Sequence, residues 1–572
     1  MFDLCWCGGI NLNTRVIINL QRHVPMATPN EKLAASLDRL KELQAGGRRV
    51  FESKELTRVH RDRLIKNGFI REVVKGWLVA TNPGADEGDT TPWYTSFWEF
   101  CACYCNKRFG RDWHLSPEQS LLLYGENTIV PRQVVVYAQK GTNNTVNLPF
   151  DTSLYDLKQT RKQWPPPADF TIRDGLRLYA PAAALIRVPE HFFQRAPVEA
   201  QVVLASFRDA SELTSRLLEG GHSAVASRLA GAFKRVGRPA IASEIVKAMK
   251  AADYDVRETD PFAPQQRLAS LSLGISPVVG RVKTLWDLMR TPVLELAPPS
   301  PGLPKDKDAY LSFVDDLYRS DAYHSLSIEG YTVTPALIER VRSGDWNPDG
   351  NPEDRRNLDA LAARGYWQAF RRVKETVSKL IRGADAGALV REDHRDWYRE
   401  MFQPAVTAGL LRPAVLAGYR NQPVYLKGSR HVPPRWETVA DAMSALFDLL
   451  EQEDVPFVRI VLGHWMLGYI HPYHDGNGRM ARFLMNAMLA AGGYPWTVIR
   501  VEDRGAYLDA LESASSGLSI GPFATFIANR IQGSMELTLQ AACAPVSEGR
   551  LARRSTSPVA PSSKRRSRGH PL

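Results

Sequence analysis

Residues 471–482, with the sequence HPYHDGNGRMAR, constrain the fold of this chain most, because they place a glycine-rich turn between two apolar helices. Apolar residues recur at helical spacing in residues 457–470 and again from Met480 onward. Gly476 and Gly478 leave the turn between them free to adopt positive φ. We therefore expect a buried helix, a polar turn and a second helix in this order.

The side chains of this turn are those that phosphate chemistry uses. The imidazole of His471 titrates near neutral pH, so it can accept a proton from an attacking hydroxyl. The carboxylate of Asp475 is a hard oxygen ligand of the kind that Mg²⁺ prefers. Gly476, Asn477 and Gly478 can bring backbone N–H groups to an anion at the start of the second helix, where the helix dipole favours phosphate.

Two arginines follow the turn. Arg479 and Arg482 are three residues apart, which places both on about one side of the first helical turn. Guanidinium groups there could clamp the outer phosphates of a nucleotide. Positioning and charge neutralisation are most of what phosphate transfer requires.

This segment resembles the core motif of the Fic family: His-Pro-Phe, any residue, Asp or Glu, Gly-Asn-Gly-Arg, any two residues, Arg. Tyr473 replaces the Phe and keeps an aromatic anchor, although its hydroxyl needs a partner if buried. The alternative, a glycine-rich turn with these residues by chance, is disfavoured by nine matched or nearly matched positions.

The resemblance implies a role for each residue. His471 would deprotonate a hydroxyl of a target protein, Asp475 would hold Mg²⁺, and residues 476–478 would cradle the α-phosphate of ATP. The product would be a protein that carries AMP. Relatives that phosphorylate have lysine at the position of Gly478, so the glycine favours AMP transfer.

A second motif, residues 325–330 (SLSIEG), matches the inhibitory pattern of the family: Ser or Thr, any three residues, Glu, then Gly or Asn. The resemblance implies that Glu329, supported by Ser325, reaches Arg482 and withholds it from the γ-phosphate. The alternative is a serine-capped turn that ends an ordinary helix at a glycine. In some relatives this glutamate aligns a water that removes AMP, so the reverse reaction stays open.

Residues 420–434 predict a short β-hairpin around Val424, Tyr425 and Leu426. It resembles the flap of the family, whose strand edge would hold an extended target segment. Downstream, Tyr507 lies where relatives line the adenine pocket, but it is equally plausible as a core residue. His464 and His474 are interpreted as structural.

The N-terminal region has a different pattern. Residues 31–44 predict a helix, residues 53–67 two short helices, and residues 69–80 a hairpin that turns at residues 75–76, which together indicate a winged helix. The region resembles AbiEi-type antitoxins, weakly to about residue 255. The second short helix has a basic face of the kind that enters a DNA groove, formed by Arg58, Arg61, Arg63 and Lys66. A solvated face or a protein contact is the alternative.

The length of 572 residues predicts two to four domains. The fold class is mainly α: an all-helical Fic core with a small β-hairpin flap, preceded by a winged-helix domain and a mixed α/β middle region. The predicted ranges are 1–30, unstructured or a mis-annotated start with Met1 or Met26 as the true first residue; 31–82, winged helix; 93–255, AbiEi-like region; 265–390, Fic N-terminal helices with the inhibitory motif; 391–535, catalytic domain; and 545–572, a disordered basic tail.

Several classes are disfavoured by composition. No run of eighteen apolar residues exists, so we expect no membrane span, and six cysteines in a chain of this length do not make a disulfide scaffold. Cys101, Cys103 and Cys105 are interpreted as buried small side chains. The expected compartment is the cytoplasm. The net charge of +11 lies partly in the tail and favours weak attraction to nucleic acid.

The sequence therefore predicts a nucleotidyltransferase. ATP and Mg²⁺ would be substrate and cofactor, and the target would be a Ser, Thr or Tyr hydroxyl of an unidentified protein or of the chain itself. A homodimer and a DNA partner are further predictions. The alternatives are a DNA-binding autoregulator whose Fic domain senses nucleotide, and a de-AMPylase on the same fold.

Overall fold

A computed structural model describes residues 28–81, 83, 89–263, 268–269, 271, 275–345 and 357–543, with side chains as far as residue 537. The chain divides into two compact units, one ending at Gly88 and the other beginning at Asp89. The predicted tail, residues 545–572, and nearly all of the predicted N-terminal segment lie outside the described residues.

The N-terminal unit combines helices with a three-stranded antiparallel sheet of order β1-β3-β2. The helix α1 begins where Thr28 and Glu31 form a capping box, and Gly76, at φ 88°, makes the turn of the β2–β3 hairpin. The first of the two predicted short helices is only a 3₁₀ turn, Ser53–Glu55. The elements are α1 (Pro29–Leu43), β1 (Val50–Glu52), α2 (Arg58–Lys66), β2 (Ile70–Val74) and β3 (Trp77–Ala80).

The predicted basic face lies on α2, but its residues differ in what they contact. Arg63 donates to the carbonyl of Lys32 at 2.6 Å and to Ser36, so its guanidinium holds α2 against α1. Arg58 and Arg61 both lie within 3.5 Å of Asp62, which offsets part of their charge. Lys66 is exposed. DNA binding by this face stays a prediction, and Arg63 serves the fold of the unit.

The second unit begins with a mixed α/β region. Its four-stranded sheet has the order β4-β5-β7-β6, with β5 and β7 parallel, and β8 and β9 form a separate hairpin. Cys101 and Cys105 are buried on α3, and Cys103 is half-buried. The elements are α3 (Thr91–Phe109), β4 (Trp113–Leu115), α4 (Pro117–Tyr124), β5 (Gln133–Ala138), β6 (Asn144–Leu148), β7 (Thr152–Lys158), β8 (Phe170–Arg173) and β9 (Leu176–Tyr179), followed by α5 (Pro181–Arg187), α6 (Phe192–Arg195), α7 (Pro197–Ser206), α8 (Ser211–Glu219), α9 (Ser223–Arg235) and α10 (Pro239–Ala251).

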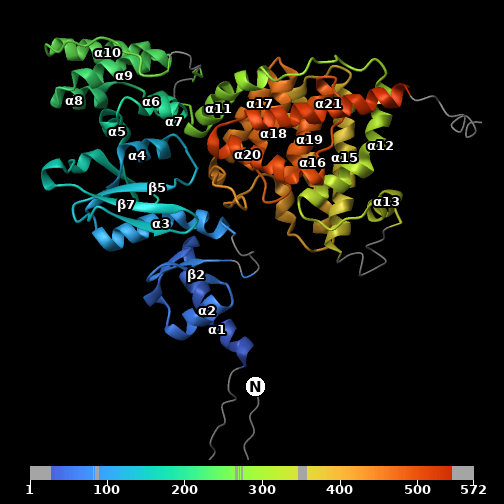
Figure 1. Cartoon of the computed structure of the whole chain (residues 1–572), viewed down its shortest axis with the longest axis horizontal. Coiled ribbons are helices and arrows are strands. Elements are labelled where there is room, and N and C mark those ends of the chain that lie inside the picture. Colours follow the sequence, from blue (N-terminus) through green and yellow to red (C-terminus); the bar gives the residue numbers. More distant parts are fainter. Residues whose placement is uncertain are drawn as a thin grey trace, which may run out of the picture. The chain divides into compact units, whose positions relative to one another are not determined.

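The rest of the unit is helical, as predicted, and Figure 1 shows its helices gathered around α18 and α19. Both of these helices are buried along almost their whole length, because their apolar residues occupy every face. No helix in the described part of the chain combines the length and apolar character that a membrane crossing requires. The helices are α11 (Pro277–Leu294), α12 (Lys307–Ile328), α13 (Pro335–Ser343), α15 (Leu358–Leu380), α16 (Ala386–Thr407), α17 (Val439–Gln452), α18 (Pro456–Ile470), α19 (Asn477–Ala491), α20 (Arg504–Gly517) and α21 (Gly521–Cys543).

The proline-rich segment 297–304 lies along the helical domain and does not act as a spacer. Ser300 donates to the carbonyl of Gly492 at 2.8 Å, and Tyr494 donates to the carbonyl of Pro298 at 2.8 Å. The segment thus joins α11 to α12 along the end of α19. It fixes the start of the helix that carries the predicted inhibitory motif.

Candidate active site

His471 is the residue at which α18 ends, and it adopts a left-handed conformation with φ 52° and ψ 60°. This conformation costs a residue other than glycine about 1–2 kcal/mol, so the surrounding structure must hold it. The Nδ1 atom lies 3.3 Å from the carbonyl of Gly468 and donates to it, which leaves Nε2 with a free lone pair. Burial lowers the pKa of His471 to about 4, so the ring is neutral at pH 7 and able to accept a proton.

Arg420 holds the turn that contains His471. Its Nε donates to the carbonyl of His471 at 2.8 Å, and its terminal nitrogens donate to the carbonyls of Ile470, Gln422 and Pro434. The side chain is only 3 % exposed, so these carbonyls replace water around a buried cation. The sequence analysis did not identify Arg420 as a site residue, because nothing in its spacing links it to residue 471.

The glycine-rich turn is closed by Asn477. Its side-chain amide accepts from the backbone N–H of Tyr473 at 2.9 Å and donates to the carbonyl of the same residue at 2.8 Å. Asn477 therefore shapes the turn, and a nucleotide would meet its backbone rather than its amide. Gly476 has φ 78°, and a Cβ there would lie 2.8 Å from the ring of Phe402, so only glycine fits.

Tyr473, the departure from the Fic motif, is buried and anchors the turn. Its ring stacks on that of Tyr398, with ring centroids 3.8 Å apart and planes 9° from parallel. Its hydroxyl has no hydrogen-bond partner among the described residues. The ring thus fulfils the expected role, whereas the hydroxyl carries an uncompensated desolvation cost.

Glu329 forms an ion pair with Arg482 at the start of α19. The two side chains approach to 2.6 Å, and Ser325 accepts from the Nε of Arg482 at 2.8 Å. A Cβ built on Gly478 would lie 2.2 Å from the Glu329 carboxylate. The carboxylate therefore lies directly over the first turn of α19, where orphan N–H groups favour an anion.

The end of α12 delivers Glu329 to this place. The helix stops because Gly330 turns to φ 92°, and Tyr331 donates to the carbonyl of Leu326 at 3.1 Å. Arg504 donates to the carbonyl of Ile328 at 2.8 Å and caps the helix from the other side. Residues 325–330 thus both end the helix, at Gly330, and supply the ion pair between Glu329 and Arg482.

Charges around Glu329 determine its ionisation. Burial alone would raise the pKa of its carboxyl, but Arg482 and then Arg479 outweigh burial and hold that pKa below the usual value. The side chain is 27 % exposed, so water screens part of this attraction. Glu329 is therefore ionised at pH 7.

The structure separates the two arginines that the sequence placed together. Arg479 lies between the rings of Tyr331 and Phe402, each with its centroid 5.2 Å from the guanidinium, and donates to Asp475 at 3.1 Å. Arg482 faces Glu329 instead. The two arginines are three residues apart on α19 and have different neighbours. Their side chains therefore contact different partners.

Asp475 fits the predicted role as the protein ligand of Mg²⁺. Its side chain is 61 % exposed and stands at the same turn as the start of α19. Mg²⁺ commonly uses one or two protein carboxylates, while water and substrate phosphates complete its shell. Within the described ranges, no group of three or more His, Cys, Asp or Glu side chains could hold a metal ion. A metal at this site would therefore depend on the phosphates.

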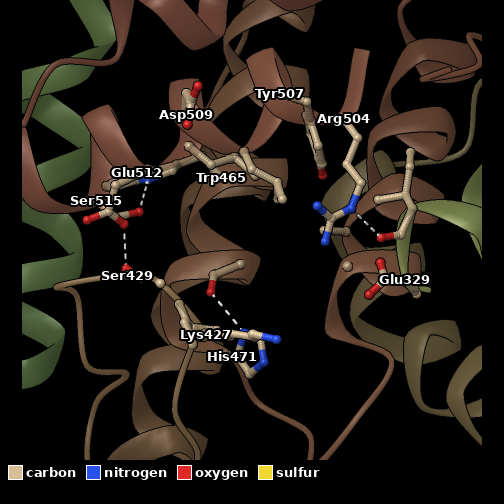
Figure 2. A pocket seen from close by; sticks show the side chains of 18 of the residues that line it. Glu329, Lys427, Ser429, Trp465, His471, Arg504, Tyr507, Asp509, Glu512 and Ser515 are labelled. Carbon is tan, nitrogen blue, oxygen red and sulfur yellow. Dashed lines mark hydrogen bonds between the residues drawn. The ribbon is translucent and has the colours of Figure 1, made fainter. Parts of the chain in front are cut away.

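A pocket of about 500 Å³ opens beside these residues (Figure 2). His471, Glu329, Gly478 and Arg482 line it. Residues of α18 and α20 complete the lining, among them Trp465, Tyr507, Leu511 and Ser515. The volume is in the range of small-molecule sites, and apolar walls with a charged end suit a nucleotide.

Tyr507 is both a core residue and a pocket residue. It is buried against Phe523 and Phe526, and it shares a hydrogen bond of 2.8 Å with His464. It also lines the pocket. Burial lowers the pKa of His464 to about 3, which agrees with its interpretation as a structural residue.

Residues 423–434, called the flap from here on, form the rim of the pocket. The predicted hairpin is absent from these residues, all of which the structure describes: residues 423–426 lie in no strand or helix, and a turn falls at residues 427–428. Arg420 takes the carbonyls of Gln422 and Pro434, and His431 pairs instead with Ile129. Tyr425 and Leu426 nevertheless line the pocket, as the prediction of a flap requires.

Comparisons with known proteins give matches to part of the chain. Residues 388–489 match the model of the Fic/DOC family, so the chain contains a Fic/DOC domain. Two relatives named "Protein adenylyltransferase Fic" are 31% identical over 230 residues (Nematostella vectensis) and 32% identical over 232 residues (Drosophila willistoni). Each match covers 40% of this chain, and the chain spans 50% and 42% of those relatives. Their names agree with the predicted nucleotidyltransferase class.

Solved structures give more distant matches. A Fic domain containing signalling protein from Bacteroides thetaiotaomicron is 19% identical with a TM-score of 0.32, and the match covers 45% of this chain and 96% of that one. Fic-1 from C. elegans is 19% identical with a TM-score of 0.34, and the match covers 61% and 93%.

Tyr473→Phe should leave the thermal unfolding temperature unchanged or raise it, because it removes a buried hydroxyl that has no partner. Tyr366→Phe is the matched control: the Tyr366 hydroxyl donates to Asp321 at 2.6 Å. Its loss should cost about 1.5–3 kcal/mol at pH 8, where Asp321, whose pKa burial raises to about 6, is ionised. Equal destabilisation by both substitutions would contradict this account.

Arg420→Met should raise the pKa of His471, because it removes a positive charge that disfavours the imidazolium and loosens the turn around it. Titration of ¹³C-labelled histidine by NMR, with His471→Ala to assign the signal, measures this shift. Arg504→Met, which alters another arginine of the pocket, serves as the control and should leave the His471 titration in place. An unchanged value in Arg420→Met would show that Arg420 does not hold the turn.

Glu329→Gln should lower the unfolding temperature at pH 7, where it removes about 1–2 kcal/mol of ion pairing. A carboxyl with a depressed folded-state pKa stabilises the fold above its unfolded value and loses this contribution as pH falls through the folded value. The difference between wild type and variant should therefore narrow below about pH 4.5. Thermal unfolding between pH 3.5 and 8 measures it, and a gap that widens in acid would refute the assignment.

Proposed function

We propose that the protein is an ATP-dependent protein adenylyltransferase that Glu329 keeps inactive. One observation carries the proposal: the Glu329 carboxylate pairs with Arg482 above Gly478, at the start of α19. His471, at the end of α18, lines the same pocket. This place combines a neutral base, an anion site and an anion that already occupies it. The names of the relatives support the same class of reaction.

The proposed reaction forms a bond between a target hydroxyl oxygen and the α-phosphorus of ATP. The bond from that phosphorus to the oxygen bridging to the β-phosphate breaks, and pyrophosphate leaves. Nε2 of His471 accepts the proton of the attacking hydroxyl, since Nδ1 is held by the carbonyl of Gly468. Mg²⁺ held by Asp475 would neutralise charge on the phosphates.

Glu329 would inhibit by competition for charge. The start of α19 and Arg482 offer one anion site, and a γ-phosphate and the Glu329 carboxylate cannot both occupy it. Ser325 holds the guanidinium through its hydroxyl and its backbone carbonyl, at 2.8 Å and 3.0 Å. Ser325 in α12 and Glu329 at its end thus both bind Arg482, which favours the inactive arrangement.

Removal of AMP is the second candidate, because Glu329 and His471 line the same pocket. A water aligned by Glu329 could attack the phosphorus of an AMP-modified side chain. The two directions differ in what Glu329 does: it hinders transfer and would be needed for removal. Wild type added to purified AMP-modified protein would release AMP only if removal occurs.

The decisive assay incubates wild type, Glu329→Gly and Glu329→Gly/His471→Ala with α-labelled ATP and MgCl₂ and follows label on the protein itself. Glu329→Gly should label about 5- to 30-fold faster than wild type, as expected when an ion pair worth about 1–2 kcal/mol is removed. The double variant should not label. Glu502→Gly, which alters an exposed carboxylate close to His324, is the control and should behave as wild type. Absence of label in every variant would overturn the proposal.

A further inference from the structure

Residues 430–431 of the flap pair with residues 129–130 of the middle region of the chain. Ile129 forms a β-bridge with His431, and the N–H of Val130 donates to the carbonyl of Arg430 at 3.0 Å. The guanidinium of Arg430 returns a hydrogen bond of 2.7 Å to the carbonyl of Val130. The flap is therefore shared between the Fic domain and a region outside the match to the Fic/DOC family.

A buried network of hydrogen bonds extends this attachment to α18, the helix that ends at His471. His431 Nε2 lies 2.8 Å from the carbonyl of Tyr469, and the Tyr469 hydroxyl accepts from Arg281 at 2.8 Å. Arg281 pairs with Glu199 of α7 at 2.8 Å, and each of these two side chains is only 2 % exposed. Because breaking a buried pair costs several kcal/mol, α7, α18 and the flap hold one fixed geometry.

A second cavity, of about 210 Å³, lies between the flap and the middle region. Tyr425 lines both this cavity and the nucleotide pocket, so the two spaces are neighbours across one side chain. The apolar side chains of its lining come from both regions and include Tyr94, Trp98, Leu176, Leu178, Val432 and Pro433.

The charged residues around this cavity are already paired. Arg173 contacts Glu126 at 2.8 Å, and Arg435 contacts Asp174 across the boundary between the two regions. Two cations and two anions leave the rim without net charge, while the aromatic and aliphatic lining remains. Such a space fits an uncharged, largely apolar side chain better than a phosphate or an acidic group.

We propose that this second cavity is a specificity subsite for the target protein, in which a large apolar or aromatic side chain of the target segment binds while its hydroxyl stands at His471. The inference rests on the proposed adenylyltransferase function and names a determinant of its substrate. A segment that runs along residues 423–426 advances about 3.3 Å per residue, so the anchoring residue lies at a fixed number of positions from the modified one. The middle region would thus supply one half of the target-binding surface.

The test uses the full-length Glu329→Gly protein, α-labelled ATP and a peptide library with a central Ser, Thr or Tyr and one varied position at a time. We expect labelling to favour Leu, Met, Phe or Tyr at one flanking position by about 10-fold or more over Asp or Gly, as one buried apolar side chain allows. Trp98→Ala should abolish this preference. Thr95→Trp, which fills the cavity, should turn it toward small residues. Ile172→Ala, an exposed position of the same region, is the control and should retain it.

The outcomes separate the two proposals. Self-labelling of Glu329→Gly without any positional preference, without any peptide labelling, or with a preference unchanged in Trp98→Ala and Thr95→Trp, overturns the subsite and leaves the adenylyltransferase intact. Absence of self-labelling overturns the adenylyltransferase and the subsite with it. Binding of a fluorescent ATP analogue, measured in parallel, should be equal in the Glu329→Gly parent and in the Trp98→Ala, Thr95→Trp and Ile172→Ala variants made from it, because Trp98, Thr95 and Ile172 do not line the nucleotide pocket.

Discussion

The structure depends on one site for negative charge at the start of α19. Backbone N–H groups, Arg482 and the glycine at residue 478 create it, and the Glu329 carboxylate occupies it. The absence of a side chain at residue 478 leaves room for the carboxylate, which lies where a Cβ would stand. The end of α12 is shaped by the same requirement: Gly330 stops the helix and Arg504 caps it, so that Glu329 faces the pocket.

A second constraint is the turn that presents His471. The residue adopts a left-handed conformation, and Arg420 holds it by binding several carbonyls at once. The same arginine also binds the carbonyls of Gln422 and Pro434, at the two ends of the flap. The flap also gains order from the middle region through Ile129 and Val130. The turn that presents His471 and the flap are therefore linked, because Arg420 binds backbone carbonyls of both.

The middle region is consequently more than an appended domain. The buried pair of Glu199 and Arg281 connects it, through the Tyr469 hydroxyl, to the helix that ends at His471. The middle region and the helical region belong to one compact unit. An enzyme whose flap is fixed by another part of the same chain can select targets by that part. The proposed subsite would give the middle region a role in the selection of targets.

The sequence by itself determined the local chemistry: a helix, a turn with His471, Asp475 and two glycines, and a motif that ends at Glu329 and Gly330. These features follow from spacing and residue type, which act over a few positions. Only the tertiary structure decided the partners. The separation of Arg479 from Arg482, the use of Arg63 inside its own unit, and the place of Arg420 all depend on groups distant in sequence. Burial and charge pairing between such groups leave no periodic signal in the chain, because each is satisfied by contacts that form only when the helices pack.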